Sequence, residues 1–261
     1  MRIALTIAGS DSGGGAGIQA DLKTFQRFGV FGTSVLTLVT AQNTRGVDAV
    51  HLLPEEALNS QLDAVATDLR PHALKTGALG SAGLVEAVAS GLRRHALAPL
   101  VIDPVLISKH GHALAGPDVV DAMQKQLLPL ATLVTPNLHE AGALVGAKLR
   151  DEEEMKEAAR AIAAKGPRAV LIKGGALGGE EAVDILFDGE EHYRLATPRI
   201  DTRHTHGTGC TYSAAITAGL AEGQSLLASV RRAKQWIAAA IARAPGLGSG
   251  SGPVDHLTPL P

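Results

Sequence analysis

The sequence has little of several features that would place it in a specialised class of protein. One of its 261 residues is a cysteine, Cys210, which excludes an intramolecular disulfide framework and any metal cluster held by several thiolates. Aromatic residues make up only 3%, so the core must be built from Ala, Val, Leu and Ile, which favours helices packed on buried parallel strands. No apolar run approaches the about 20 residues that a membrane helix needs. The composition predicts no disulfides and no membrane span.

Charge of one sign is also lacking. The 24 Lys and Arg residues nearly balance the 26 Asp and Glu residues, and the formal net charge is −2. That balance gives no field to hold a polyanion, so we expect no nucleic-acid partner. The apolar run after Arg2 is only about six residues long and enters a glycine-rich turn. We therefore interpret it as a first strand rather than a signal peptide, and we expect a cytoplasmic protein.

Strand-like and helix-like segments alternate along the whole chain, which is the order that βαβ units produce. We expect one α/β domain over residues 1–261, with three α/β/α layers and a mostly parallel central sheet. A tail of Gly, Ser and Pro from about residue 246 is predicted to be mobile. Predicted strands are 2–8, 34–41, 73–76, 99–103, 131–135 and 168–173, with a hairpin over 182–195; predicted helices are 19–28, 54–69, 83–95, 119–128, 137–145, 151–165, 209–222 and 226–244.

Two glycine-rich segments follow predicted strands, where ligands bind in open parallel sheets. Residues 9–17 contain five glycines in nine positions, but no Lys follows the last of them, so the segment does not match the P-loop pattern. Such a loop lets the backbone approach a flat ligand closely; a flexible turn explains it equally well. The segment 75–80 has two glycines after a strand, and it fits a plain strand-to-helix turn as well as a functional one.

A pair of acids lies at two other predicted strand ends. Asp103 closes the strand before Pro104, and Glu140 lies within 135–140. A carboxylate at the end of a buried strand is costly to desolvate unless it is paired, hydrogen-bonded or near a cation. Two carboxylates, together with water and substrate phosphates, are how Mg²⁺ is usually held. The alternative is that Asp103 caps a turn and Glu140 is a solvated residue of a first helical turn.

The sharpest signal is the segment 205–211, which precedes a small apolar helix. The backbone amides of Gly207–Cys210 would be unpaired donors at the start of that helix, and such a cup binds a phosphate or the charge of a migrating phosphoryl group. A thiol at a helix N-terminus is expected to have a lowered pKa, and Cys210 could then take a proton from an attacking hydroxyl. The alternative is a small buried cysteine that packs as a hydrophobe.

These segments occur in one register that resembles a known family. From about Ile3 to Val254 the chain is similar to the hydroxymethylpyrimidine (phosphomethylpyrimidine) kinases of thiamine biosynthesis, members of the ribokinase-like superfamily. No single motif carries the resemblance, but seven in order do. The segments are GSDSGGGAGIQADLKTF, VTAQNTRGV, KTGALG, DPV followed by SKHGHAL, TPNLHEA, KGG and THGTGC.

The resemblance implies a pyrimidine site near the first glycine-rich loop. Asp21 and Gln42 match the acid and amide that hydrogen-bond the ring nitrogen and amino group, and both side chains suit an aminopyrimidine edge. Leu79 stands where the family has a Met against the ring, and Gly9 and Val105 complete the substrate contacts. The glycine-rich loop departs from the family pattern, because it lacks the Pro that often follows the Asp.

The resemblance also implies a phosphoryl-transfer site that uses ATP and Mg²⁺. Asp103 and Glu140 match the metal-holding positions, directly or through water. The residues implied to lie beside the nucleotide phosphates are Lys173, Gly174 and Thr208, and those implied to form the anion hole are Gly207, Thr208 and Gly209. Cys210 occupies the catalytic position, where most ribokinase-like enzymes have Asp.

The implied activity is two successive phosphorylations, of 4-amino-5-hydroxymethyl-2-methylpyrimidine and then of its monophosphate. Lys109 and His110 could pair with the extra phosphate, although a solvated loop explains them as well. One alternative is a pyridoxal kinase of the Cys type, and another is a regulator that binds the pyrimidine without catalysis. Members of the superfamily are commonly dimers, so we expect a homodimer formed through an exposed strand of the early segment.

Overall fold

The computed structural model describes residues 1–106 and 116–261. Nine strands of this part of the chain form one sheet in the order β3-β2-β1-β4-β5-β6-β7-β8-β9. All pairings from β2 to β7 are parallel, and the antiparallel ones are β2 with β3, β7 with β8 and β8 with β9. The mostly parallel sheet is thus confirmed. The strands are β1 (Ile3–Asp11), β2 (Phe31–Gln42), β3 (Val47–Leu52), β4 (Ala73–Thr76), β5 (Leu100–Ile102), β6 (Leu133–Val134), β7 (Val170–Lys173), β8 (Glu181–Phe187) and β9 (His192–Pro198).

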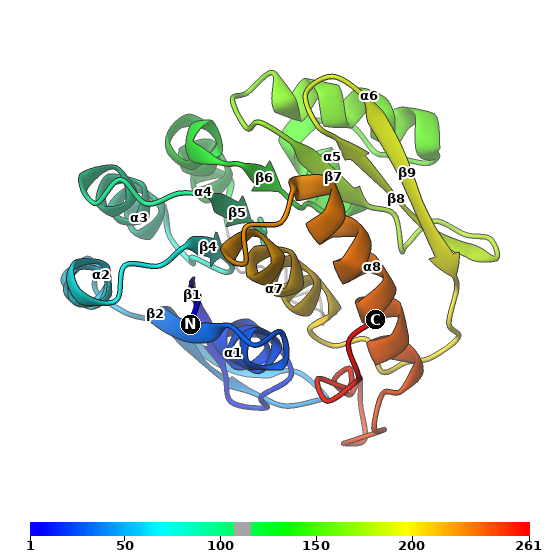
Figure 1. Ribbon diagram of the computed structural model, residues 1–261, viewed down its shortest axis with the longest axis horizontal. Coiled ribbons are helices and arrows are strands. Elements are labelled where there is room, and N and C mark those ends of the chain that lie inside the picture. The colour runs from blue at the N-terminus through cyan, green and yellow to red at the C-terminus, as the bar shows by residue number, and fades with distance from the viewer. Residues whose placement is uncertain (107–115) are drawn as a thin grey trace.

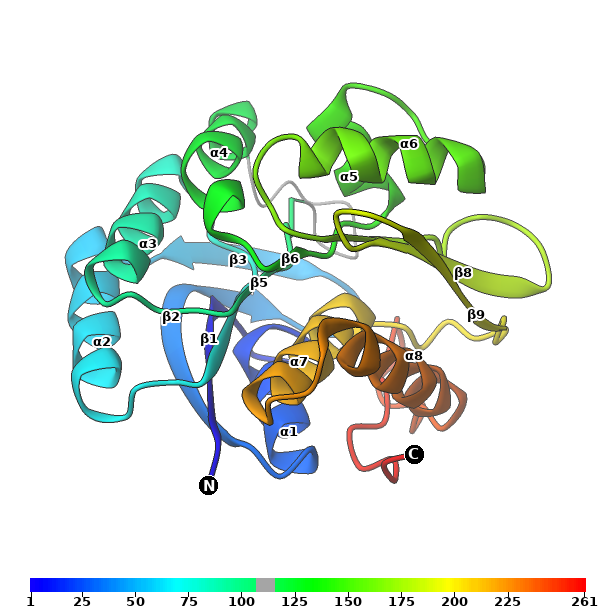
Figure 2. The same cartoon turned by 45° about the horizontal axis from the view of Figure 1, so that its top comes forward.

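Helices cover both faces of the sheet, which gives the predicted three layers (Figure 1). Helices α2 to α6 pack on one face, and α1, α7 and α8 pack on the other (Figure 2). The helices are α1 (Gly17–Arg27), α2 (Glu55–Asp68), α3 (Ala82–Arg94), α4 (Pro117–Ala122), α5 (Leu138–Val145), α6 (Glu152–Ala163), α7 (Thr208–Ala221) and α8 (Leu226–Ala242), and α4 continues into a π-helical turn, Met123–Leu127, and a 3-10 turn, Leu128–Leu130.

The central strands are apolar throughout because each contributes to two cores. Along β1, Leu5 and Ile7 belong to the core under α2 to α6, while Ala4 belongs to the core under α1, α7 and α8. On β4, Leu74 belongs to the core under α2 to α6, and Ala73 belongs to the core under α1, α7 and α8. A continuous apolar run without alternation is typical of a parallel strand that is buried on both faces. These strands therefore place their carboxyl ends at one edge of a rigid sheet.

Two helix starts determine what faces that edge. Helix α5 has a capping box, in which Asn137 accepts from the Glu140 amide and the Glu140 carboxylate accepts from the Asn137 amide. Helix α7 has no side-chain cap; its N-cap is Gly207, at φ 74°. A side chain at Gly207 would collide with the carbonyl of Gly15, so only glycine allows this close approach. The Thr208 amide donates to Thr205 O at 3.3 Å, and the next amides of the first turn are left for a ligand.

Strand β3 and the last residues differ from the sequence-based prediction. Val47–Leu52 was not predicted as a strand, and it pairs antiparallel with β2. The tail predicted to be mobile from residue 246 is instead packed on the protein: Trp236 Nε1 donates to Thr258 O at 3.0 Å, and Val254 is buried. Ser251 N donates to Thr44 O at 2.8 Å. The prediction was wrong because glycines in this segment allow close contact, as the loop after β2 requires.

No helix in residues 1–106 or 116–261 is long and apolar enough to cross a membrane.

Candidate active site

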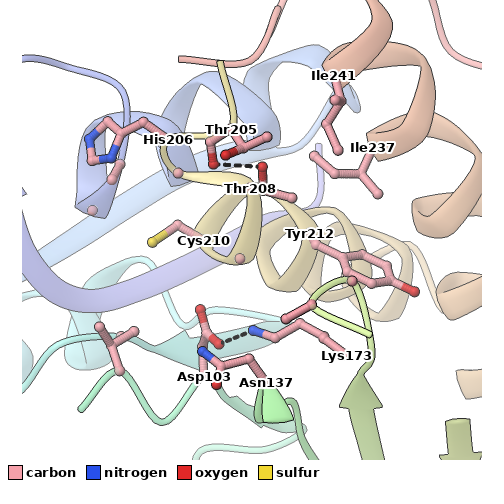
Figure 3. Close-up of a pocket in the computed structure, with 18 of the residues that line it drawn as sticks. Asp103, Asn137, Lys173, Thr205, His206, Thr208, Cys210, Tyr212, Ile237 and Ile241 are labelled. Carbon is pink, nitrogen blue, oxygen red and sulfur yellow. Dashed lines mark hydrogen bonds and ion pairs between the residues drawn. The ribbon is translucent and has the colours of Figure 1, made fainter. Parts of the chain in front are cut away.

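A cavity of about 800 Å³ opens at the carboxyl ends of the parallel strands. Ligands bind at this edge of open α/β sheets. Residues from the ends of β1, β2, β5 and β7 line it, and the start of α7 closes one side (Figure 3). The sequence-predicted site residues that line it are Gly9, Gln42, Asp103, Val105, Glu140, Lys173, Gly207, Thr208, Gly209 and Cys210.

The positive end of the site combines an ammonium group with the start of a helix. Lys173, at the end of β7, places its Nζ 2.7 Å from Asp103 Oδ1, the pair drawn with a dashed line in Figure 3. A side-chain carbon at Gly209 would lie 3.2 Å from Lys173 Nζ, so the first turn of α7 and this lysine are close neighbours. Thr208 Oγ1 donates to Thr205 O at 2.8 Å and tightens the turn. Uncapped amides beside an ammonium group form a binding place for phosphate.

Asp103 is buried and ionised. Burial alone would raise its pKa, but the charges of Lys173 and Lys75, with a hydrogen bond from Lys173, hold the pKa of Asp103 below its ordinary value. Thr135 Oγ1 also donates to Asp103 Oδ1, at 3.2 Å. The pKa of Lys173 is raised: burial opposes the shift, and Asp103 and Glu140 outweigh it. The pair is therefore charged on both sides at neutral pH.

Glu140 lines the same cavity and is short of compensating charge. Burial, and the negative charge of Asp103, raise the pKa of Glu140 to about 7, although Lys173 and the amide of Asn137 oppose the shift. Two buried carboxylates that repel each other are a favourable place for a divalent cation, so this donor set fits Mg²⁺ held with help from substrate phosphates. The described residues contain no group of three or more His, Cys, Asp or Glu side chains that could hold a metal by themselves.

Cys210 lies in the first turn of α7, partly buried, and the pKa predicted for it was wrong in direction. Burial, together with the charges of Asp21 and Asp103, raises the pKa of Cys210 to about 12, although Lys75 opposes the shift. The helix start alone would lower it. Helix α1 brings Asp21 beside this turn and the end of β5 brings Asp103, and the effect of these carboxylates together with burial is larger than that of the helix start. The sulfur is therefore a thiol at neutral pH.

Two groups of polar residues in the cavity wall were missed by sequence reasoning. The first is Asp11 with His206, whose Nε2 lies 2.9 Å from Asp11 Oδ2. The second is Asp184 with Lys234, a nearly buried ion pair at 2.7 Å. Asp11 had a local signal, since an Asp that precedes a glycine run can accept from its amides. The Asp184–Lys234 pair joins residues 50 positions apart, so no local pattern announces it.

Comparison with known proteins identifies the family. Residues 11–255 match the family model described as phosphomethylpyrimidine kinase. The chain belongs to this family. The hydroxymethylpyrimidine/phosphomethylpyrimidine kinase of Streptomyces coelicolor is 53% identical over 254 residues, which cover 97% of this chain and 94% of the relative.

Solved structures agree with the sequence comparison. The phosphomethylpyrimidine kinase of Clostridium difficile is 42% identical, with a TM-score of 0.81 over 91% of this chain and 98% of that one. The pyridoxal kinase of Bacillus subtilis, solved as an ADP complex, is 41% identical, with a TM-score of 0.92 over 99% of this chain and 98% of that one. The predicted ribokinase-like fold and the kinase family are thus confirmed.

Three residues that the phosphomethylpyrimidine kinase family implied for the site lie behind the cavity wall. Asp21 is fully buried, and both its oxygens lie 2.9 Å from Lys75 Nζ. Leu79 is buried in the core under α2 to α6. Gly174 packs against Met155, and its amide donates to an aspartate at 3.1 Å. The structure therefore does not support direct ligand contacts by Asp21, Leu79 or Gly174, because packing takes each away from the cavity.

The implied partners for a second phosphate, Lys109 and His110, lie outside the described residues.

Proposed function

We propose that this member of the phosphomethylpyrimidine kinase family transfers the γ-phosphate of ATP to 4-amino-5-hydroxymethyl-2-methylpyrimidine, and then phosphorylates the monophosphate to the pyrophosphate, in thiamine biosynthesis. One observation carries the proposal. The uncapped start of α7, with Cys210 in its first turn, opens into the same cavity as the Lys173–Asp103 pair. A site built in this way suits a migrating phosphoryl group with a hydroxyl acceptor beside it.

The ATP phosphates would lie between Lys173 and the amides of Gly207–Gly209. The ADP complex of the related pyridoxal kinase supports a nucleotide in this fold. Asp103 and Glu140 would hold Mg²⁺, which when bound offsets charge on the phosphate oxygens. Lys173 stays charged beside Asp103, so it offers a second positive group without needing to move a proton. Because phosphoryl transfer proceeds through a loose transition state, positioning and charge stabilisation supply most of the catalysis.

The pyrimidine would lie over the glycine-rich loop, with its hydroxymethyl oxygen toward Cys210. Cys210 is a thiol at rest, and a loose transition state requires little base strength from it. We therefore assign Cys210 the orientation of the attacking hydroxyl through a hydrogen bond at its sulfur. The hydroxyl oxygen forms the new P–O bond as the bond to ADP breaks, and the hydroxyl proton passes to an oxygen of the transferred phosphoryl group. Replacing Cys210 with Ala should lower kcat at least about tenfold, because a reacting group that loses its orientation typically loses at least that much rate. A smaller loss would exclude this role.

The decisive experiment supplies the protein with ATP, Mg²⁺ and the pyrimidine alcohol and follows the products by mass spectrometry. We expect the monophosphate first and the pyrophosphate later, with two ADP released per pyrimidine. Pyridoxine in a parallel reaction tests the alternative kinase activity through its kcat/KM. Binding of the alcohol without any release of ADP would indicate a regulator and overturn the proposal.

We also propose that the protein is a cytoplasmic homodimer, with the edge of the sheet at β3 as the contact. Among the described strands β3 pairs only with β2, and Val50 and Leu52 on it are 40% and 49% exposed. Exposed apolar side chains on a free strand edge favour association. Light scattering coupled to size exclusion should give twice the chain mass of 26.8 kDa. Leu52→Asp should restore the monomer, and a monomeric native protein would refute the proposal.

A further inference from the structure

Four side chains form a hydrogen-bonded chain along the cavity wall beside the glycine-rich loop. Asp11 accepts from three backbone amides of that loop at 2.8 to 3.0 Å, and its Oδ2 lies 2.9 Å from His206 Nε2. The same nitrogen lies 3.2 Å from one end of the Gln42 amide. The other end of that amide lies 3.2 Å from Thr40 Oγ1, which donates to Ser10 O at 3.0 Å.

The protonation of Asp11 and of His206 Nε2 follows from which of the two groups can donate a hydrogen bond and which can only accept one. Burial alone would raise the pKa of Asp11, but His206 and the loop amides lower it, so the side chain is a carboxylate. A carboxylate only accepts hydrogen bonds, and a ring nitrogen 2.9 Å away must therefore carry a proton. His206 Nε2 is a donor in the neutral ring with this tautomer and in the charged ring alike.

The donor on His206 fixes the orientation of the Gln42 amide, whose two orientations differ by a half-turn. An NH₂ group facing His206 Nε2 would oppose one donor with another, whereas the carbonyl oxygen can share, as a second acceptor, the proton that Nε2 donates to Asp11. With the carbonyl toward His206, the NH₂ group lies at Thr40 and donates to Oγ1. The single hydroxyl proton of Thr40 then goes to Ser10 O. Only this orientation gives each donor of the chain an acceptor.

We propose that His206, fixed by Asp11, is a positioning residue that locks the Gln42 amide with its carbonyl toward α7, and thereby selects ring substrates in which an amino group adjoins an unprotonated ring nitrogen. The inference rests on the proposed function and names the chemistry that the site recognises. The carbonyl pairs with the amino group, and the NH₂ group pairs with the ring nitrogen. A ring with a carbonyl beside a protonated nitrogen presents the opposite pattern and meets two mismatches.

The fixed orientation of the Gln42 amide would also determine where the hydroxymethyl group of the substrate points. In 4-amino-5-hydroxymethyl-2-methylpyrimidine the hydroxymethyl group is on the carbon next to the one bearing the amino group. Pairing of the amino group with the Gln42 carbonyl places both substituents on the His206 side of the ring. The chain continues there from His206 through Gly207 into the first turn of α7, where Cys210 lies (Figure 3). Recognition of the edge and orientation of the hydroxyl thus depend on one proton of His206.

The test compares the 4-amino alcohol with its 4-oxo analogue in the native protein and in His206→Phe. The His206 ring packs close to Gly15, where a side-chain carbon would lie 2.7 Å from Cδ2. Phe keeps such a ring but removes the donor. The native protein should prefer the 4-amino alcohol by at least about a hundredfold in kcat/KM, since the wrong edge leaves buried polar groups unpaired. In H206F we expect the preference to fall below about tenfold through the KM values of the two alcohols, with the KM for ATP unchanged.

Two further variants separate orientation from a general structural effect. His206→Gln retains an N–H donor and should restore most of the preference. His204→Phe is the matched control, because its ring accepts from the Gly252 amide at 3.2 Å and does not contact Gln42; it should discriminate as the native protein does. Where H206F does not fold, His206→Met gives the same comparison, since Met also lacks a donor.

The outcomes are distinct. If H206F prefers the 4-amino alcohol over the 4-oxo alcohol in kcat/KM as strongly as the native protein does, the inference is overturned. It is also overturned if kcat/KM falls equally for both alcohols and the KM for ATP rises, because His206 would then only support the start of α7. If the native protein phosphorylates neither alcohol, the proposed function fails. Calorimetric binding of the two alcohols in the absence of ATP then still reports the amide orientation, and equal affinities in native protein would overturn the inference.

Discussion

Replacing Lys75 with Met should destabilise the protein strongly, because it leaves a carboxylate alone in the interior. Lys75 and Asp21 are both 0% exposed, and Nζ lies 2.9 Å from each carboxylate oxygen. From the residues that the structure describes, Asp21 would keep the single hydrogen bond from Thr6 Oγ1, at 2.6 Å. Breaking a buried pair in this way costs about 3–5 kcal/mol, most of it the desolvation of the remaining charge. We expect K75M to lose that much free energy of unfolding.

Urea unfolding followed by tryptophan fluorescence measures this loss directly, because the chain has one Trp, Trp236, and it is fully buried. The double variant Asp21→Leu with Lys75→Met removes both charges, and it should recover most of the stability. Lys125→Met is the matched control, since its ion pair with Asp121 is exposed and worth less than about 1 kcal/mol. A K75M loss no greater than that of K125M would refute the reasoning.

Three other predictions follow from the site and from the packed tail. With its pKa raised to about 12, the thiol of Cys210 should react with iodoacetamide at pH 7.5 more than about a hundredfold more slowly than free cysteine, as mass spectrometry of this single thiol would show; a rate like that of free cysteine would contradict the raised pKa. The pKa of Glu140 is raised to about 7, so the folded state holds its proton more tightly than the unfolded state, and stability is lost as pH rises from about 4.5 to about 7. This loss of unfolding free energy is at most about 3 kcal/mol, and it should be absent in Glu140→Gln when stability is measured against pH in the presence of EDTA. A pH profile in the variant that equals the native profile would contradict the raised pKa of Glu140. A side-chain carbon at Gly250 would collide with Thr44 O, whereas Gly46 has open space around it. In thermal unfolding, Gly250→Ala should therefore lose about 1–3 kcal/mol of unfolding free energy, and Gly46→Ala should stay within about 0.5 kcal/mol of the native protein. Equal effects of the two substitutions would mean that the tail shifts at little cost in free energy.

Most of the fold could be predicted from the sequence because buried parallel strands and amphipathic helices leave strong local patterns. The strand Ala73–Thr76 was predicted with its bounds, and the helix predicted over 151–165 is α6 (Glu152–Ala163), whose cap Asp151 accepts from the Glu154 amide at 2.8 Å. Strand β3 was missed because it is an edge strand: Val50 and Leu52 are exposed, so no buried alternation marks it. The tail was wrongly predicted as mobile because glycine permits both flexibility and close contact, and composition alone does not distinguish them.

The site was predictable where its chemistry is local. The uncapped start of α7 follows from the glycines before Cys210. Asp103 follows from its position at a strand end, and Glu140 from its position in the helix start after the next strand. The properties that depend on distant charges were not predictable: the pKa of Cys210 is set by burial and by carboxylates from other elements, and Asp21 lies against Lys75, 54 positions away. The His206–Asp11 pair was missed for the same reason.

The Asp11–His206 contact joins positions 195 residues apart, and it has a consequence for how activity appears during folding. Contacts of such long sequence separation form late, after the entropy of closing the intervening loop has been overcome. Catalytic competence should therefore return only with the last step of renaturation, later than helix content. For the same reason, two fragments of the polypeptide divided between β7 and β8 would each hold half of the machinery, and turnover would report their reassembly.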